Sequence, residues 1–240
     1  MRQRVRKTLT YVSLFLFPVT MNFFSPYVSV DGAFSGVVSA SVIVFGLLFV
    51  GALFFGRAWC GWLCPMAGMA DLCMSLNVLP APVKRLRVIR YVVFAIWFAT
   101  LASGFVVAGG IDSINLVHLT ESGVSVDEPF KYVTYYLVLL TFFGLSLWLG
   151  KRGACHAVCW MAPFMTAGTR VWRFLHLERL KVVSEPHTCT GCKTCTTNCP
   201  MGIAVDQEML RGSISHVDCI RCAACVDGCP SGSLRLHFGK

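Results

Sequence analysis

The sequence predicts a mainly α-helical membrane protein, in which a bundle of four transmembrane helices in two duplicated pairs precedes a small α+β domain. Three observations favour this fold class. The 240 residues are 55% hydrophobic and only 14% charged, with a mean hydropathy of +0.65, which is too apolar for an ordinary soluble protein. Long uncharged runs recur in the first two thirds, and one cysteine pattern occurs twice in the last fifty residues.

Four apolar runs are long enough to be membrane helices, because about 20 apolar residues span the hydrocarbon core. The first, at about 9–30, follows a basic start and has no small-residue cleavage site, so it is predicted to be a retained helix with a kink at Pro18 rather than a signal peptide. The other three cover about 34–55, 88–109 and 132–150. Residues 1–168 are therefore expected to form the membrane domain.

The basic residues predict the orientation of these helices. Arginines and lysines precede the first helix, lie between the second and third, and follow the fourth, whereas acidic residues gather in the other two connections. The positive-inside rule then predicts a multi-pass protein of the prokaryotic cytoplasmic (inner) membrane, with both termini in the cytoplasm. The same rule accounts for the net charge of +9, so nucleic acid is not predicted as a partner.

A short segment, 169–183, joins the membrane domain to the C-terminal domain. It combines apolar residues at helical spacing with Arg170, Arg173, Arg179 and Lys181, and is predicted to be a linker helix. Two placements stay open. The helix lies in the membrane interface, where basic residues suit anionic headgroups, or it packs on its own domain.

The C-terminal residues 184–240 carry the pattern C-x2-C-x2-C-x3-C-P twice, thirty residues apart. Three closely spaced thiolates converge on one iron–sulfur cluster, while the fourth cysteine, before proline, crosses to the other cluster. The predicted ligands are Cys189, Cys192, Cys195 and Cys229 for cluster I, and Cys219, Cys222, Cys225 and Cys199 for cluster II. Zinc is usually held by paired C-x2-C knuckles, and a disulfide framework fits poorly in a reducing cytosol. Two [4Fe-4S] clusters are therefore predicted.

A second cysteine repeat follows the second and fourth apolar runs. Both copies fit R-x2-C-x3-C-x-M-A, 95 residues apart at every matching position, with Cys60 and Cys64 in one copy and Cys155 and Cys159 in the other. A constant offset predicts a duplicated unit of two helices and a cysteine pair. Two such pairs would bring four thiolates to a third metal or iron–sulfur site. Buried apolar cysteines or reversible dithiols are the alternatives.

The tandem pattern resembles that of bacterial two-cluster ferredoxins, and the whole chain resembles the NapH/NosR-type membrane polyferredoxins. The C-x3-C-P sequence at 60–65 is similar to the motif of that family, whereas Trp160 stands where the pattern has proline. The resemblance implies a cytoplasmic, α+β, ferredoxin-like C-terminal domain. It also implies that single electrons pass between a quinone pool, or a cytoplasmic donor, and a partner oxidoreductase.

No catalytic residue is predicted, because a one-electron carrier supplies neither an acid nor a base. We expect an electron-transfer subunit of a redox complex rather than a stand-alone enzyme. Quinone is a possible partner, for which His118, with Asp112 and Glu121 nearby in sequence, would supply the proton-accepting group. Two other functions stay open: an accessory protein that supplies electrons for metalloenzyme maturation, and an iron–sulfur redox sensor.

Overall fold

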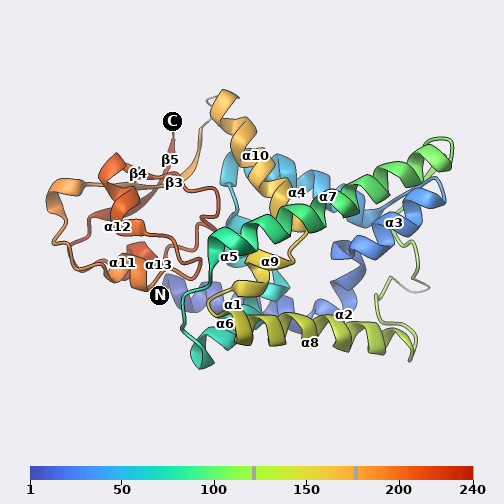
Figure 1. The fold of residues 1–240 in the computed structure, drawn as a ribbon, viewed down its shortest axis with the longest axis horizontal. Helices are drawn as coiled ribbons and strands as arrows, with labels where there is room; N and C mark the ends of the chain where they lie inside the picture. The colour runs from blue at the N-terminus through green and yellow to red at the C-terminus, as the bar shows by residue number, and fades with distance from the viewer. Residues whose placement is uncertain (121–122, 176–177, 240) are drawn as a thin grey trace.

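The computed structural model describes residues 1–120, 123–175 and 178–239. Two long helices, α7 (Val83–Val107) and α8 (Lys131–Leu149), run along the long axis of the molecule, and the C-terminal elements lie at one end of them (Figure 1). Both helices are long and apolar enough to cross a membrane, and most of their side chains are not buried inside the molecule. They correspond to the third and fourth predicted spans.

The first predicted span is not one helix, so this prediction is wrong. Residues 9–30 are divided among α1 (Arg2–Phe15), α2 (Phe17–Thr20), the 3-10 helix η1 (Met21–Phe24) and α3 (Pro26–Phe34). Two prolines give the physical reason, because proline has no amide hydrogen and is tolerated only in the first turn of a helix. Pro18 lies in the first turn of α2, and Pro26 begins α3.

The second predicted span begins later than expected. Residues Val37–Ser39 form a short strand, β1, which pairs in parallel with β2 (Ser113–Asn115). Helix α4 then runs over Ala40–Phe55, and it is apolar but shorter than α7 and α8. In the part of the chain that the structure describes, two helices rather than four meet the length and composition of a membrane span.

The two copies of the second cysteine repeat fold alike. The short helix α5 (Ala58–Trp62) follows α4, and α9 (Gly153–Ala157) follows α8, so that both bounds differ by the 95 residues of the repeat. A glycine with positive φ ends the long helix of each copy, Gly56 at 59° and Gly150 at 79°. Helices α6 (Pro65–Leu76) and α10 (Met161–Leu175) complete the copies.

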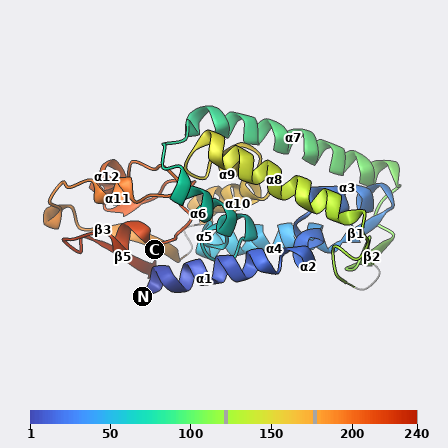
Figure 2. The same cartoon turned by 90° about the horizontal axis from the view of Figure 1, so that it is seen from below.

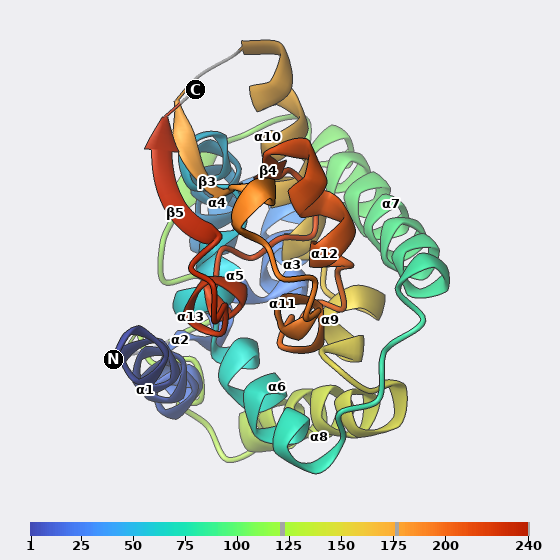
Figure 3. The same cartoon turned by 90° about the vertical axis from the view of Figure 1, so that its left-hand side faces the viewer.

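The helices of the two copies exchange partners. Helix α10 of the second copy packs against α4 of the first, and α6 of the first packs against α8 of the second. Helix α1 covers α6, on the side of the molecule opposite α7 (Figure 2). In the view from the C-terminal domain, α5 and α9 lie inside a ring of longer helices (Figure 3). The exchange therefore brings both cysteine pairs towards the centre.

The predicted linker helix is wrong over its second half. Helix α10 includes residues up to 175, but Arg179–Ser184 form strand β3. This strand is the centre of an antiparallel sheet in the order β4 (Ser213–Ile214), β3, β5 (Leu234–Gly239). Val182 is buried between two half-buried neighbours, which is the alternation of a strand. The side chain of Arg173 and residues 176–177 lie outside the described part of the chain.

The C-terminal domain is α+β, as the sequence predicts. Two short helices, α11 (Thr194–Thr197) and α13 (Ala224–Asp227), differ by the thirty residues of the cysteine pattern. The other connections contain short helical segments: η2 (Pro186–Thr188), α12 (Val205–Glu208) and η3 (Met209–Arg211). Because β3 is the first strand of the sheet, the domain begins at 179 rather than at 184.

Candidate iron–sulfur and metal centres

The two cysteine loops of the C-terminal domain turn in the same way. Gly191 and Lys193 have positive φ angles of 71° and 55° in the first loop, and Arg221 and Ala223 have 53° and 61° at the matching positions of the second. Positive φ is uncommon for residues other than glycine. Turns of this kind form backbone concavities that bind anions, including iron–sulfur clusters. In the first loop, the Gly191 amide donates to Cys189 Sγ at 3.4 Å.

Two cavities of this domain are each lined by four cysteines. The first has a volume of about 320 Å³ and is lined by the thiols of Cys189, Cys192, Cys195 and Cys229. The second has about 20 Å³ and is lined by those of Cys199, Cys219, Cys222 and Cys225. The fourth cysteine of each repeat therefore lies with the first three cysteines of the other. These donor sets fit the thiolate chemistry of [4Fe-4S] clusters.

The two sets differ in their exposure to solvent. Cys189 and Cys192 are exposed, whereas none of the four thiols around the smaller cavity is. Hydrogen bonds from Thr194 lower the pKa of Cys192. Burial instead raises the pKa of Cys199 to about 11. Burial also raises the pKa of Cys222 and Cys225, so these thiols and Cys199 are protonated at neutral pH unless a bound cation draws out their protons.

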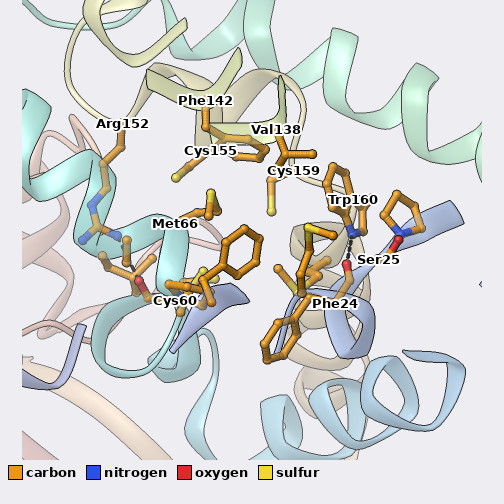
Figure 4. Close-up of a pocket in the computed structure, with 18 of the residues that line it drawn as sticks. Phe24, Ser25, Cys60, Met66, Val138, Phe142, Arg152, Cys155, Cys159 and Trp160 are labelled. Carbon is orange, nitrogen blue, oxygen red and sulfur yellow. Dashed lines mark hydrogen bonds between the residues drawn. The ribbon is translucent and has the colours of Figure 1, made fainter. Parts of the chain in front are cut away.

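The second repeat brings its four cysteines to one apolar pocket, which we call the four-cysteine pocket. Cys60, Cys64, Cys155 and Cys159 all line this cavity of about 70 Å³. Figure 4 shows Cys155 and Cys159 entering from one side and Cys60 from the other, with Met66 between them. Burial raises the pKa of Cys155 to about 12 and that of Cys64 well above its usual range. Without a cation these thiols are neutral.

A single metal ion has no ready site among these thiols. In the described ranges, no group of three or more histidine, cysteine, aspartate or glutamate side chains is arranged to hold one ion. A mononuclear zinc site would need its sulfurs about 2.3 Å from the metal, whereas a cubane cluster spaces its thiolates more widely. The third metal or iron–sulfur site therefore stays a prediction.

A group of buried arginines lies on one side of the four-cysteine pocket, and two of them, Arg57 and Arg152, line it. The motif arginines are each paired with a carboxylate: Arg57 with Asp218 at 2.8 Å, and Arg152 with Asp71 at 2.7 Å. The sequence pattern included both arginines but assigned them no role. We call the buried set the arginine junction, and its members are Arg6, Arg57, Arg90, Arg152, Arg221, Asp71 and Asp218.

Asp218 ties the helical part to the C-terminal domain. Its carboxylate also pairs with Arg87 at 2.7 Å and with Arg90 at 2.9 Å. Burial opposes its ionisation, but the three arginines outweigh that effect and lower the pKa of Asp218 well below its usual range. Asp218 is the residue before Cys219, so α7 and the turn before α5 are anchored directly to the second cysteine loop.

Helix α5 touches the same loop through its backbone. A Cβ atom on Gly61 would lie 2.4 Å from the carbonyl oxygen of Ile220, so only glycine fits there. The Trp62 indole donates to the carbonyl of Arg221 at 3.0 Å. Ile220 and Met201 line both the four-cysteine pocket and the smaller cavity of the C-terminal domain. The two cavities are therefore neighbours across a thin wall.

In the described residues, the loop predicted to bind quinone lines a small cavity. His118 Nε2 lies 2.9 Å from Asp31 Oδ1, and the cavity beside it measures about 10 Å³. Asp112 lies in the same loop, and Glu121 falls outside the described residues. A much larger apolar cavity of about 510 Å³ lies between η1, α4 and α5. The sequence did not predict this cavity, because apolar residues that line a cavity in a membrane protein have the same composition as those that face lipid.

Comparisons with known proteins support the prediction that this protein binds iron–sulfur clusters. A family model for a 4Fe-4S dicluster domain matches residues 181–230, and one for a 4Fe-4S binding domain matches residues 38–77. The methylamine utilization ferredoxin-type protein MauN of Methylobacillus flagellatus is 28% identical over 90% of this chain and 76% of that protein. No solved structure matches significantly.

Two further relatives are longer proteins. The putative electron transport protein YccM of Escherichia coli is 25% identical over 86% of this chain and 58% of its own length. The nitrogen fixation protein FixG of Rhizobium meliloti is 28% identical over 77% of this chain and 39% of its own length. Together, fold, cysteine sets and relatives define an iron–sulfur protein of the ferredoxin type. More narrowly, the chain is similar to the membrane ferredoxin-type proteins of the NapH/FixG class, which confirms the predicted resemblance.

Replacing Asp71 should strongly destabilise the protein. Asp71→Ala leaves Arg6, at 2.8 Å, and Arg152 without their carboxylate, and an uncompensated buried charge costs about 3–5 kcal/mol. Asp227→Ala is the matched control, because Asp227 pairs with Arg2 at the surface, where such a pair contributes about 1 kcal/mol or less. Unfolding followed in detergent micelles measures both losses. Equal losses in the two variants would contradict the prediction.

Proposed function

We propose that the protein is a membrane-bound iron–sulfur electron carrier, which passes single electrons between a quinone pool or a cytoplasmic donor and a partner oxidoreductase. The observation that carries the proposal is that each cavity of the C-terminal domain is lined by one crossed set of four cysteines. The relative named as an electron transport protein, YccM, supports the same class of function. Quinone stays a prediction of the sequence.

We further propose that the two crossed sets are the cluster ligands. Cys189, Cys192, Cys195 and Cys229 would hold cluster I, and Cys219, Cys222, Cys225 and Cys199 would hold cluster II. A bound cluster supplies one-electron chemistry. The chain supplies the thiolate ligands and the backbone N–H groups of the two loops. It also supplies charged side chains around each set of four cysteines, and these charges differ between the two sets.

Single-cysteine variants test the crossing. Cys229→Ala should remove the same EPR signal as Cys192→Ala, and Cys199→Ala the same signal as Cys222→Ala. Each variant should hold about four fewer irons than the wild-type protein, since one cluster loses a ligand. Iron and sulfide analysis with EPR of the dithionite-reduced protein gives both readouts. Cys73→Ala is the control, because Cys73 is buried in α6 and belongs to neither repeat.

An uncrossed arrangement would give the opposite grouping. Cys199→Ala would then match Cys192→Ala, and the proposed ligand sets would be wrong. Zinc in place of iron in the purified protein would overturn the electron-carrier function itself.

We also propose that the four-cysteine pocket holds a third metal or iron–sulfur site. Support comes from the convergence of all four thiols and from the 4Fe-4S binding domain model, whose match at 38–77 includes Cys60 and Cys64. Two methionines, Met66 and Met161, also line the pocket and add soft sulfur donors.

Metal analysis of a pocket variant tests the third site. Replacing Cys60, Cys64, Cys155 and Cys159 by serine should lower the metal content to the iron of the two ferredoxin-type clusters, about eight atoms. The wild-type protein should hold more, and Cys73→Ser should match the wild type. An equal metal content in all three proteins would show that the pocket binds no metal.

We propose that the protein is a multi-pass membrane protein in which α7 and α8 cross the membrane, with both termini and the C-terminal domain in the cytoplasm. The acidic residues Asp31, Asp112 and Asp127 belong to segments at the end of the helices away from the C-terminal domain (Figure 1). The arginine junction and the basic N-terminus lie at the other end. This separation of charge supports the orientation given by the positive-inside rule.

Reporter fusions test the orientation. Green fluorescent protein fused to the C-terminus should fluoresce, because it folds in the cytoplasm, and alkaline phosphatase fused after Val117 should be active, because it folds only outside the cytoplasm. Activity assays on intact cells give both results. Active phosphatase at the C-terminus would reverse the orientation. No contact in the described part of the chain favours a maturation factor or a redox sensor over an electron carrier.

A further inference from the structure

The arginine junction carries more positive charge than its own carboxylates balance. Its five arginines are at most 4% exposed. Arg57 and Arg152 line the four-cysteine pocket, and Arg221 lines the cluster II cavity. In the described residues, only two buried carboxylates, Asp71 and Asp218, accompany them. Five arginines against two carboxylates leave three uncompensated positive charges. Such charges are costly to bury without anionic partners.

Hydrogen-bond donors without an acceptor indicate the same shortage of negative charge. Four arginines of the junction have buried guanidinium nitrogens without an acceptor: Arg57, Arg90, Arg152 and Arg221. Arg221 belongs to the cluster II loop itself, between Cys219 and Cys222. Arg57 and Arg90 both pair with Asp218, the residue before Cys219. The missing negative charge is therefore expected at the second cysteine loop, which contains Arg221, and at the adjoining four-cysteine pocket, which Arg57 and Arg152 line.

The environment of the cluster I cysteines is different. Two of them are exposed, and the charged side chains that line their cavity are Lys193 and Asp206. These two charges balance, and water reaches both the cavity and its thiols. No arginine of the junction lines this cavity.

We propose that the arginine junction raises the reduction potential of cluster II above that of cluster I. The inference rests on the proposed ligand sets. Reduction adds one electron to a cluster and moves no proton, so the bound centre becomes more negative by one charge. Burial alone disfavours that added charge, whereas nearby cations favour it. Because three cations are unbalanced and little screened by water, their attraction outweighs the cost of burial.

The order of potentials has a consequence for the direction of electron flow. The centre that is easier to reduce lies against the four-cysteine pocket, behind Ile220 and Met201. The centre that is harder to reduce faces water. Electrons from a soluble donor would therefore collect on the side of the C-terminal domain that meets the helices.

A redox titration of the holo-protein tests the order directly. The purified protein is reduced stepwise with dithionite under anaerobic conditions, and the EPR signals of the two clusters are followed. A water-soluble dysprosium chelate should relax only the signal of the exposed cluster I. We expect the signal that the chelate leaves unchanged to appear first on reduction. If the chelate-sensitive signal appears first, the inference is wrong.

Charge variants test the cause. Arg152→Gln should lower the higher midpoint potential, and Asp218→Asn should raise it, with the other potential unchanged. Opposite shifts cannot come from general damage to the fold. Arg87→Gln, at the partly exposed edge of the Asp218 group, gives a second lowering variant if Arg152→Gln does not fold. Arg211→Gln is the control, because this arginine is at the surface and outside the junction.

The outcomes separate this inference from the proposed function. Variants that keep the full iron content of the wild type but leave both potentials unchanged would overturn the role of the junction. A wild-type protein without two [4Fe-4S] signals would instead overturn the proposed ligand sets.

Discussion

Two buried carboxylates hold the structure together, and the rest of the molecule depends on their ion pairs. Asp71 joins α1 to the turn before α9, through Arg6 and Arg152. Asp218 joins the second cysteine loop to α7 and to the turn before α5. Removing either charge from water costs several kcal/mol, which only close and well-oriented partners can offset. The Asp71 pairs therefore fix the helices relative to one another, and the Asp218 pairs fix the C-terminal domain against them, more strictly than apolar contacts would.

The buried cysteines and the buried arginines have complementary electrostatic requirements. Burial keeps Cys199 and Cys155 protonated, because a thiolate without a cation would be unstable there. The arginine junction, in turn, lacks anionic partners. A bound cluster provides what both groups lack. Its iron ions stabilise the four cysteines as thiolates, and its net negative charge compensates the arginines. Assembly of the clusters and final packing of the domain are thus expected to be coupled.

The sequence predicted what depends on local spacing. The cysteine patterns and the apolar helices α7 and α8 follow from residues close together in the chain, whereas the α+β domain was implied by the family resemblance. A kink at Pro18 was predicted, but the new helix that begins at Pro26 was missed, because the apolar composition continues through it. The strand at 179–184 was missed because a basic apolar segment is compatible with either a helix or a strand. The pair of Arg57 with Asp218 joins residues 161 positions apart, and no local pattern reveals it.

The departure of the second repeat from the first has a structural meaning. Pro65 begins α6 in the first copy, where its missing amide hydrogen costs nothing. Trp160, at the matching position, donates its indole N–H to the carbonyl of Phe24 at 2.9 Å, which proline could not do (Figure 4). This bond fixes η1 against the four-cysteine pocket. The duplication therefore brings four cysteines together, but the two pairs are held differently. Trp160 ties the second pair to η1, whereas the carbonyls of Gly61 and Leu63, beside the first pair, accept hydrogen bonds from Arg6 and Ser13 of α1.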